Sequence, residues 1–233
     1  MTDRDPLYRR HRFPAEIIAH AVLLYFRFPL SLRMVEDMLA ARGIIVSHQT
    51  IRLWAEKFGR SFANRIRRRS SGRLGDKWHL DEAAISIRGE KHWLWRAVDQ
   101  DGFVLEVLVQ SRRNAEAAKR LMRKLLKGHG RAPRVMVTDK LRSYDAAKRE
   151  IMPGVDHRSH KGLNNRAENS HQPIRRRERI MKRFKSRRQL QRFVSIHDPI
   201  ANLFHISRHD ISASHHRELR AAAMNMWTDI ART

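Results

Sequence analysis

The spacing of apolar residues divides the chain into a helical first quarter and a mixed remainder. In residues 13–60, apolar side chains recur at helical intervals in three runs that begin near Pro14, Ser31 and Ser47. Proline suits the first turn of a helix and serine suits the N-cap, and Gly43 closes the second run. Two short helices joined by a tight turn, the second opening with polar residues, predict a helix-turn-helix. A three-helix bundle without DNA contacts is the alternative.

From residue 76 the apolar period becomes two, which is typical of strands. Three such runs, at 77–87, 93–98 and 103–109, are separated by turn residues and predict an antiparallel meander. An amphipathic helix capped by Asn114 follows, and then a short apolar strand at 134–139. This order predicts an α/β protein, a ribonuclease-H-like mixed sheet flanked by helices and preceded by a small all-α helix-turn-helix domain.

These patterns predict four segments along the chain. We expect a DNA-binding domain at 1–60, a basic linker at 61–75, a catalytic core at 76–188 and a helical tail at 189–233 that Pro199 interrupts. The sequence has no internal repeat and no low-complexity segment.

Charge narrows the function. Lysine and arginine number 49 against 24 acids, a formal net charge of +25. An excess this large predicts a polyanionic partner, nucleic acid before an anionic membrane. There is no cysteine, no order typical of a signal peptide and no apolar run long enough to span a bilayer. We therefore expect a soluble, cytoplasmic protein directed at DNA or RNA.

Three groups of side chains are the candidates for DNA contact. The third predicted helix would present His48, Gln49 and Arg52 to a major groove. The linker and a strongly basic later segment would contact phosphates through Arg67, Arg68, Arg69, Arg175, Arg176, Arg179, Lys182, Arg183 and Lys185.

Two aspartates suggest the chemistry. Asp81 lies within the first strand, on a mostly apolar face, and Asp139 ends the strand at 134–139. On adjacent strands their carboxylates would approach one another and repel unless cations lay between them. Oxygen ligands suit Mg²⁺, or Mn²⁺, and a pair of ions activates a water or 3′-hydroxyl for attack on phosphate.

A third acid is needed, and Glu168 is the best candidate. It lies in a segment, 164–181, that reads as one helix with Arg175 two turns along the same face. Spacing alone also admits Glu150 and Glu178. Glu82 alternates to the face opposite Asp81, which favours a surface or structural role.

The motifs together resemble the DDE transposases of bacterial insertion-sequence family six. The resemblance runs in order from about residue 8 to 206 and rests on these segments: Trp78-His-Leu-Asp-Glu82, Arg96-Ala-Val-Asp-Gln-Asp-Gly102, Ser111-Arg-Arg-Asn-Ala-Glu-Ala-Ala-Lys-Arg120, Val137-Thr-Asp-Lys140, Asp156-His-Arg158 and Asn164-Asn-Arg-Ala-Glu-Asn-Ser-His-Gln-Pro-Ile-Arg-Arg-Arg-Glu-Arg179.

The resemblance implies a catalytic triad of Asp81, Asp139 and Glu168, with Arg175 as the basic residue associated with the glutamate. It also implies replicative transposition, which joins donor and target DNA through cointegrates. Because both ends must be held together, we expect a homodimer or larger assembly on double-stranded DNA, the terminal repeats and the target, with two Mg²⁺ ions at the acids. Two rival functions stay open. One is a non-catalytic helix-turn-helix regulator, and the other is a ribonuclease-H-like nuclease without strand transfer.

Overall fold

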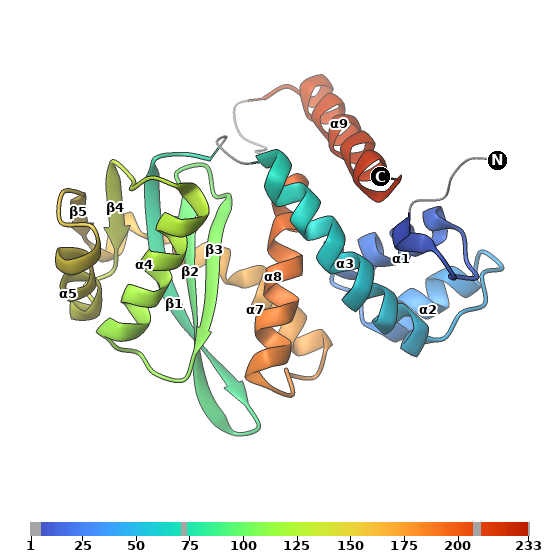
Figure 1. Ribbon diagram of the computed structural model, residues 1–233, viewed down its shortest axis with the longest axis horizontal. Helices are drawn as coiled ribbons and strands as arrows, with labels where there is room; N and C mark the ends of the chain where they lie inside the picture. Colours follow the sequence, from blue (N-terminus) through green and yellow to red (C-terminus); the bar gives the residue numbers. More distant parts are fainter. Residues whose placement is uncertain (1–5, 71–73, 207–210, 233) are drawn as a thin grey trace. The chain divides into compact units, whose positions relative to one another are not determined.

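The computed structural model describes residues 6–70, 74–206 and 211–232, and the chain divides into two compact units. One unit contains residues 1–69 together with 195–233, and the other contains residues 70–194. Figure 1 labels their helices and strands.

The first unit is helical. Its N-terminal part contains the three helices that the sequence predicts, and Ser31 caps the second by accepting a hydrogen bond from the Met34 amide at 3.1 Å. Gly43 follows that helix with φ 72°, a left-handed conformation that favours glycine. The elements are η1 (Pro6–Tyr8), α1 (Ala15–Arg27), α2 (Leu32–Ala40), α3 (His48–Ser70) and α9 (Ala213–Arg232).

Helix α3 is longer than expected, which corrects the start of the predicted linker. It runs without a break to Ser70, so the segment 61–70 is helical rather than a connection. The reason is a buried stripe, Phe58, Phe62 and Ile66, that continues at four-residue spacing through the arginine-rich stretch. Residues 71–73 of the expected linker lie outside the described residues.

The C-terminal helix α9 belongs to this helical unit. The Tyr8 hydroxyl donates to the Ala231 carbonyl at 2.6 Å, and the Arg65 guanidinium donates to the Ile230 carbonyl at 2.8 Å. Trp227 packs edge-on against Phe62 with ring centroids 5.3 Å apart. The last helix is therefore fastened to the first and third, and the segment expected as a separate tail at 189–233 is divided between the two units.

The second unit is built on one five-stranded sheet with strand order β3-β2-β1-β4-β5. The first three strands form the predicted antiparallel meander, and β4 and β5 run parallel to β1. This is the predicted ribonuclease-H-like mixed sheet, and the fold class is confirmed. The strands are β1 (Lys77–Ile87), β2 (Glu90–Asp99), β3 (Val104–Gln110), β4 (Val135–Thr138) and β5 (Asp156–Ser159).

Two helices cover one face of that sheet (Figure 1). Trp78 and Leu80 of β1 pack there against Leu121 of α4 (Ala115–His129) and Tyr144 of α5 (Arg142–Ile151). Asn114 caps α4 as predicted, and Gly130 ends it with φ 66°. Because Trp78 and Leu80 face this core, the side chains of the other even-numbered residues of β1 point to the same side of the sheet.

The segment expected as one helix at 164–181 is broken, which is a correction. It forms α6 (Asn165–Ser170) and α7 (Gln172–Ile180), with His171 between them, and η2 (Lys161–Leu163) precedes it. Pro173 lacks an amide hydrogen and stands in the first turn of α7, where none is needed. Arg175 is therefore not on a continuous helix with Glu168.

Pro199 was expected to interrupt the helical tail, but helix α8 (Arg187–Leu203) continues through it. The helix thus tolerates the loss of one backbone donor at that position. Within the described ranges, no helix combines the length and the hydropathy needed to cross a membrane.

We expect the buried stripe of α3 to dominate the stability of the helical unit. Phe62 is fully buried, so Phe62→Ala should lower the free energy of unfolding by about 3–5 kcal/mol in chemical denaturation. Leu53→Ala is the matched control on the same helix, because Leu53 is 65% exposed. This substitution should change the free energy of unfolding by less than about 0.5 kcal/mol. If Phe62→Ala lowers the free energy of unfolding as little as Leu53→Ala does, Phe62 is not part of the core.

Candidate active site

Strand register brings Asp81 and Asp139 to the same level of the sheet. Leu80 of β1 pairs with Thr138 of β4 in parallel, so the next residue on each strand is one of the two aspartates. Parallel neighbours lie about 4.8 Å apart, which places the two backbones as close as a sheet allows. The predicted approach of these two acids is what the structure shows.

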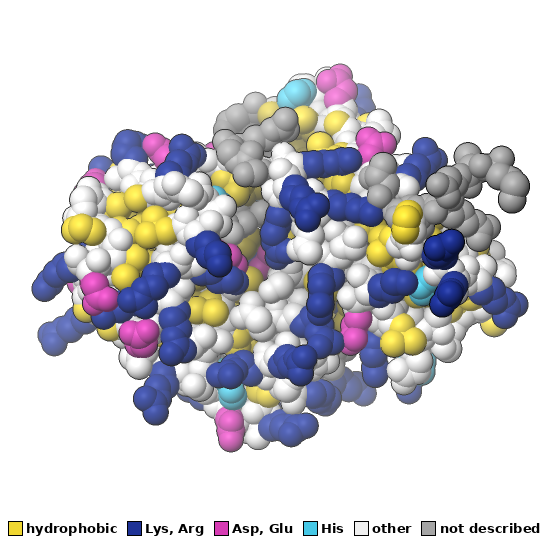
Figure 2. Space-filling view, viewed as in Figure 1, with side chains coloured by type: hydrophobic (Ala, Val, Ile, Leu, Met, Phe, Trp, Pro, Cys, Tyr) yellow, Lys and Arg dark blue, Asp and Glu magenta, His cyan; other side chains and the backbone are white. Residues whose placement is uncertain are grey.

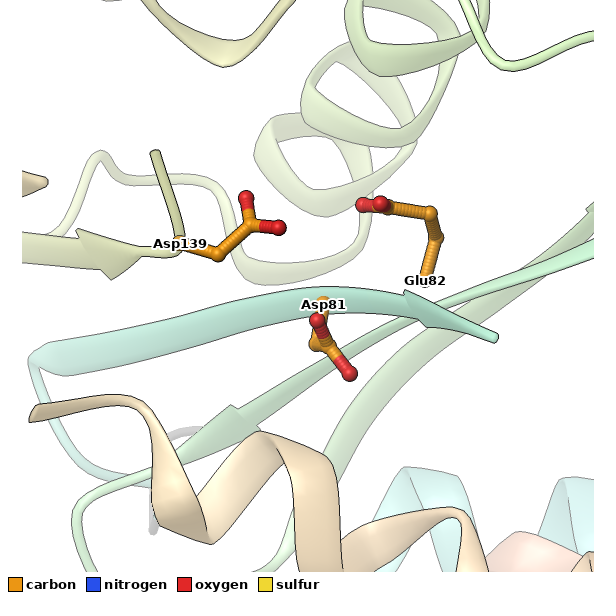
Figure 3. Close-up of side chains that lie close together, drawn as sticks. All are labelled: Asp81, Glu82 and Asp139. Atoms are coloured by element: carbon orange, nitrogen blue, oxygen red, sulfur yellow. The ribbon is translucent and has the colours of Figure 1, made fainter. Parts of the chain in front are cut away.

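A third carboxylate joins them. Ligand oxygens of Asp81, Glu82 and Asp139 all lie within 4.8 Å of one another. Figure 3 shows Glu82 and Asp139 pointing toward each other on one side of β1, while Asp81 projects from the other side. The side chains of Asp81 and Asp139 are 14% and 24% exposed, whereas that of Glu82 is fully buried. Two of the three acids are thus open to solvent.

Two hydrogen-bond donors, the buried Tyr144 and the partly exposed Arg113, satisfy Glu82. The Tyr144 hydroxyl donates to its Oε2 at 2.7 Å, and the Arg113 Nε donates to its Oε1 at 2.6 Å. Desolvation raises the pKa of Glu82 from 4.5 to about 7, and the hydrogen bonds from Tyr144 and Arg113 oppose that rise. Burial, followed by the Glu82 charge, raises the pKa of Tyr144 well above its ordinary value. Glu82 has the environment of a structural acid, which agrees with its predicted face.

Asp81 has a basic neighbour on the other face of β1. Nε2 of His171, between α6 and α7, lies 3.2 Å from Oδ2 of Asp81. His171 is buried, and desolvation is the largest cause of the lowering of its pKa, so the neutral imidazole is favoured. Asn164 holds the same segment to β1, since its side-chain amide donates to the Leu80 carbonyl at 2.8 Å.

Glu168 lies outside this cluster of carboxylates. It is exposed on α6, a helix that packs on β1 and β2. Spacings of four and three residues place it on the same helix face as Asn164 and His171, which contact β1 at Leu80 and Asp81. The alternative Glu150 is ion-paired with Lys119 and Arg123 on the far side of α4 and α5, and it also lies outside the cluster.

The donors present fit a hard divalent cation. Asp81 and Asp139 offer carboxylate oxygens that are close together and partly exposed, as Mg²⁺ or Mn²⁺ requires. Asp139 is oriented by the Leu141 amide, which donates to its Oδ1 at 3.0 Å, and by Arg113, whose guanidinium lies 3.5 Å from its Oδ2. Two like charges held this close are stabilised by a cation between them.

The basic side chains expected to contact DNA are mostly exposed. Figure 2 shows Lys and Arg far outnumbering acids on the displayed face. Three of the expected residues have hydrogen-bond partners within the chain. The Lys185 ammonium donates to the Lys182 carbonyl at 3.3 Å. The His48 amide and its Nδ1 lie 3.1 and 3.2 Å from the Glu36 carboxylate, and Arg67 hydrogen-bonds to Asn64 and the Ser195 carbonyl. The exposed members are Gln49, Arg52, Arg68, Arg69, Arg175, Arg176, Arg179, Lys182, Arg183 and Lys185.

A mixed sheet with two acids at neighbouring strand positions defines a class, the DDE domain. Residues 75–207 match the family described as DDE domain, of the IS240 type of transposase. The chain belongs to the DDE transposases of insertion-sequence family six, and the resemblance found in its motifs is confirmed.

Two curated relatives come from Staphylococcus aureus. The transposase of insertion sequence IS257 in transposon Tn4003 is 28% identical over 172 residues, 72% of this chain and 76% of that protein. The transposase of the insertion-sequence-like element IS431mec from strain Mu50 matches with the same identity and coverage. Among solved structures, a chain of the simian T-cell lymphotropic virus intasome in complex with PP2A regulatory subunit B56 gamma has 13% identity and a TM-score of 0.40, over 54% of this chain and 49% of that chain.

Sequence reasoning missed two residues at this site. Arg113 lies in the loop before α4 and Tyr144 lies in α5, both distant along the chain from Glu82. Arg113 stands inside the segment 111–120 that carries the family resemblance, and that was the available signal. No spacing rule links Tyr144 to Glu82, because only the packing of α5 on the sheet brings them together.

The raised pKa of Glu82 predicts a pH-dependent stability. The folded state holds the proton up to about pH 7 and the unfolded chain only to about 4.5, so stability should fall as pH rises between these values, by about 3 kcal/mol at most. Glu82→Gln should remove that part of the slope when chemical denaturation is repeated across the range. The exposed acid of β2, Glu90, supplies the control, and Glu90→Gln should keep the wild-type slope.

Proposed function

We propose that this chain binds the ends of an insertion sequence and catalyses metal-dependent DNA strand cleavage and strand transfer. The observation that carries the proposal is the pairing of Leu80 with Thr138, which sets Asp81 beside Asp139 in a chain of the DDE transposase family. The reaction class is polynucleotidyl transfer, in which a water or a 3′-hydroxyl attacks a phosphate in line.

Asp81 and Asp139 would hold the divalent ions, two Mg²⁺ or Mn²⁺, because they are the clustered acids with exposed oxygens. Bound ions would polarise the scissile phosphate and activate the attacking oxygen. The residues around them fix the carboxylates. The neutral His171 and the Leu141 amide orient Asp81 and Asp139 respectively.

Glu168 is the proposed third ligand. It shares a helix face with two residues that contact β1, and its carboxylate is exposed rather than committed to the core. Helix α6 packs on the sheet and is only six residues long. A small shift of this short helix would bring the Glu168 carboxylate into the site when metal and DNA bind. Arg175, on α7, would contact a phosphate near the scissile bond.

DNA binding divides between the two units in this proposal. Gln49 and Arg52, exposed near the start of α3, would read base edges in the terminal repeats, with His48 tied to Glu36 and so placed to support them. The exposed Arg68 and Arg69 and the basic side chains of the segment 175–185 would contact phosphates and supply affinity without reading sequence.

We further propose replicative, cointegrate-type transposition in the bacterial cytoplasm, with the protein on the nucleoid when bound. Both ends of an element must be held together with the target, so a homodimer or larger assembly on DNA follows from the reaction. The rival functions make different demands. A regulator needs no acid pair, and a nuclease of this fold needs no strand joining.

Removing any one proposed ligand should abolish strand transfer and leave end binding intact. Asp81→Asn, Asp139→Asn and Glu168→Gln each remove a ligand charge at nearly constant size, so Mg²⁺-dependent joining of end DNA should fall by a factor of about 10³ or more in a gel assay. Glu150→Gln, an exposed acid outside the cluster, is the matched control and should stay near wild type. Substantial joining by one of the three would remove that residue from the site.

The proposed division of DNA contacts, with base edges recognised by α3 and phosphates bound by the segment 175–185, gives a second test. In the full chain, Arg52→Ala should lower the preference for the terminal repeat over random duplex, at a cost of about 1–3 kcal/mol on the repeat alone. Arg179→Ala should weaken both duplexes alike and lower the salt slope by about one. Binding titrations at several salt concentrations measure both. If Arg52→Ala weakens the two duplexes equally, sequence reading lies outside α3.

A further inference from the structure

Three carboxylates meet at the candidate site, but their oxygens are not equally available. Both oxygens of Glu82 have donors, Arg113 on Oε1 and Tyr144 on Oε2, and the side chain is fully buried. Asp81 and Asp139 are partly exposed. An acid whose lone pairs are engaged by a guanidinium and a hydroxyl is a poor ligand until those donors leave.

Arg113 is well placed to keep that arrangement. Its Nε and one terminal nitrogen approach Glu82 Oε1 at 2.6 and 2.5 Å, and the same terminal nitrogen lies 3.5 Å from Asp139 Oδ2. The guanidinium also stacks on the Trp93 ring, 5.0 Å from its centroid. Contacts from β1, β2 and the residue after β4 thus hold one cation between two of the three carboxylates.

We propose that Arg113 is a positioning residue that keeps Glu82 out of the metal-ligand set and fixes Asp139 within it. This inference rests on the proposed metal-dependent function. It assigns Glu82 the role of anchoring Arg113, and it explains why the acid next to Asp81 in the chain is buried against α5 rather than turned to solvent.

Charge determines what happens without the guanidinium. A carboxylate oxygen of Glu82 would then lie within 4.8 Å of the Asp81 and Asp139 oxygens with no guanidinium beside it, and the site would offer three carboxylates instead of two. Ligand charge sets the affinity of oxygen sites for divalent cations, so such a site should bind them more tightly. The extra ligand would also occupy a coordination position that substrate needs, and joining should slow.

The test is calorimetric titration of the full-length chain with Mn²⁺ alone. Arg113→Gln should lower the Kd for Mn²⁺ roughly tenfold while reducing strand joining. Glu82→Gln should leave the Kd within about twofold of wild type, because Glu82 is not a ligand. The double variant should return the Kd to the wild-type range, and Arg113→Lys, which keeps the charge without the fork, should lie between Arg113→Gln and wild type.

Arg112→Gln is the matched control, since it removes the same charge from the neighbouring exposed position and should change neither Kd nor joining. An unchanged or raised Kd in Arg113→Gln overturns the proposal, and so does a large loss of Mn²⁺ affinity in Glu82→Gln. If Arg113→Gln does not fold, as circular dichroism would reveal, Glu82→Gln and Arg113→Lys still decide it.

A separate outcome concerns the function itself. Asp81→Asn should abolish Mn²⁺ binding in wild-type background. If it does not, the metal site is elsewhere and the proposed function fails at its first step. If it does, and Arg113→Gln behaves as wild type, only the role of Arg113 is refuted.

Discussion

The sheet unit, residues 70–194, depends on the parallel pairing of β1 with β4. That pairing is short, from Lys77 opposite Val135 to Leu80 opposite Thr138, and all the paired residues except Lys77 are buried. A slip of one residue would turn Met136, which packs in the core under α4 and α5, to the other face of the sheet, so that core enforces the register. The position of Asp139 beside Asp81 is therefore a product of apolar packing, and not of any attraction between two like charges.

Polar neighbours then stabilise the acidic side chains that the strand register has placed close together. One side of β1 carries Glu82 into the core, where Arg113 and Tyr144 offset the desolvation of its carboxylate. The other side carries Asp81 to His171, held by a helix that Asn164 fastens to the same strand. Each face of one strand thus supplies a different kind of support, and the period of two along β1 separates them.

Much of this could be predicted from the sequence. The strand at 77–87, the cap at Asn114 and the two acids followed from local pattern, because periodicity and capping depend on residues close in the chain. Helix ends were harder, since the burial of Phe62 and Ile66 extends α3 and only tertiary contacts reveal it. The break at His171 was not predicted, although Pro173 stands in the first turn of α7. The partners of Glu82 come from elements far along the chain, which no local pattern specifies.

The attachment of α9 to α1 and α3 has a consequence for synthesis on the ribosome. The helical unit is discontinuous, because residues 70–194 are translated before Trp227 and Ala231 emerge to meet Phe62 and Tyr8. The sheet unit can complete its core while the nascent chain is still attached, but the N-terminal helices wait for α9. A polypeptide released early would therefore carry a finished sheet beside an unclosed bundle, with the aromatic surface of α3 exposed to chaperones and proteases.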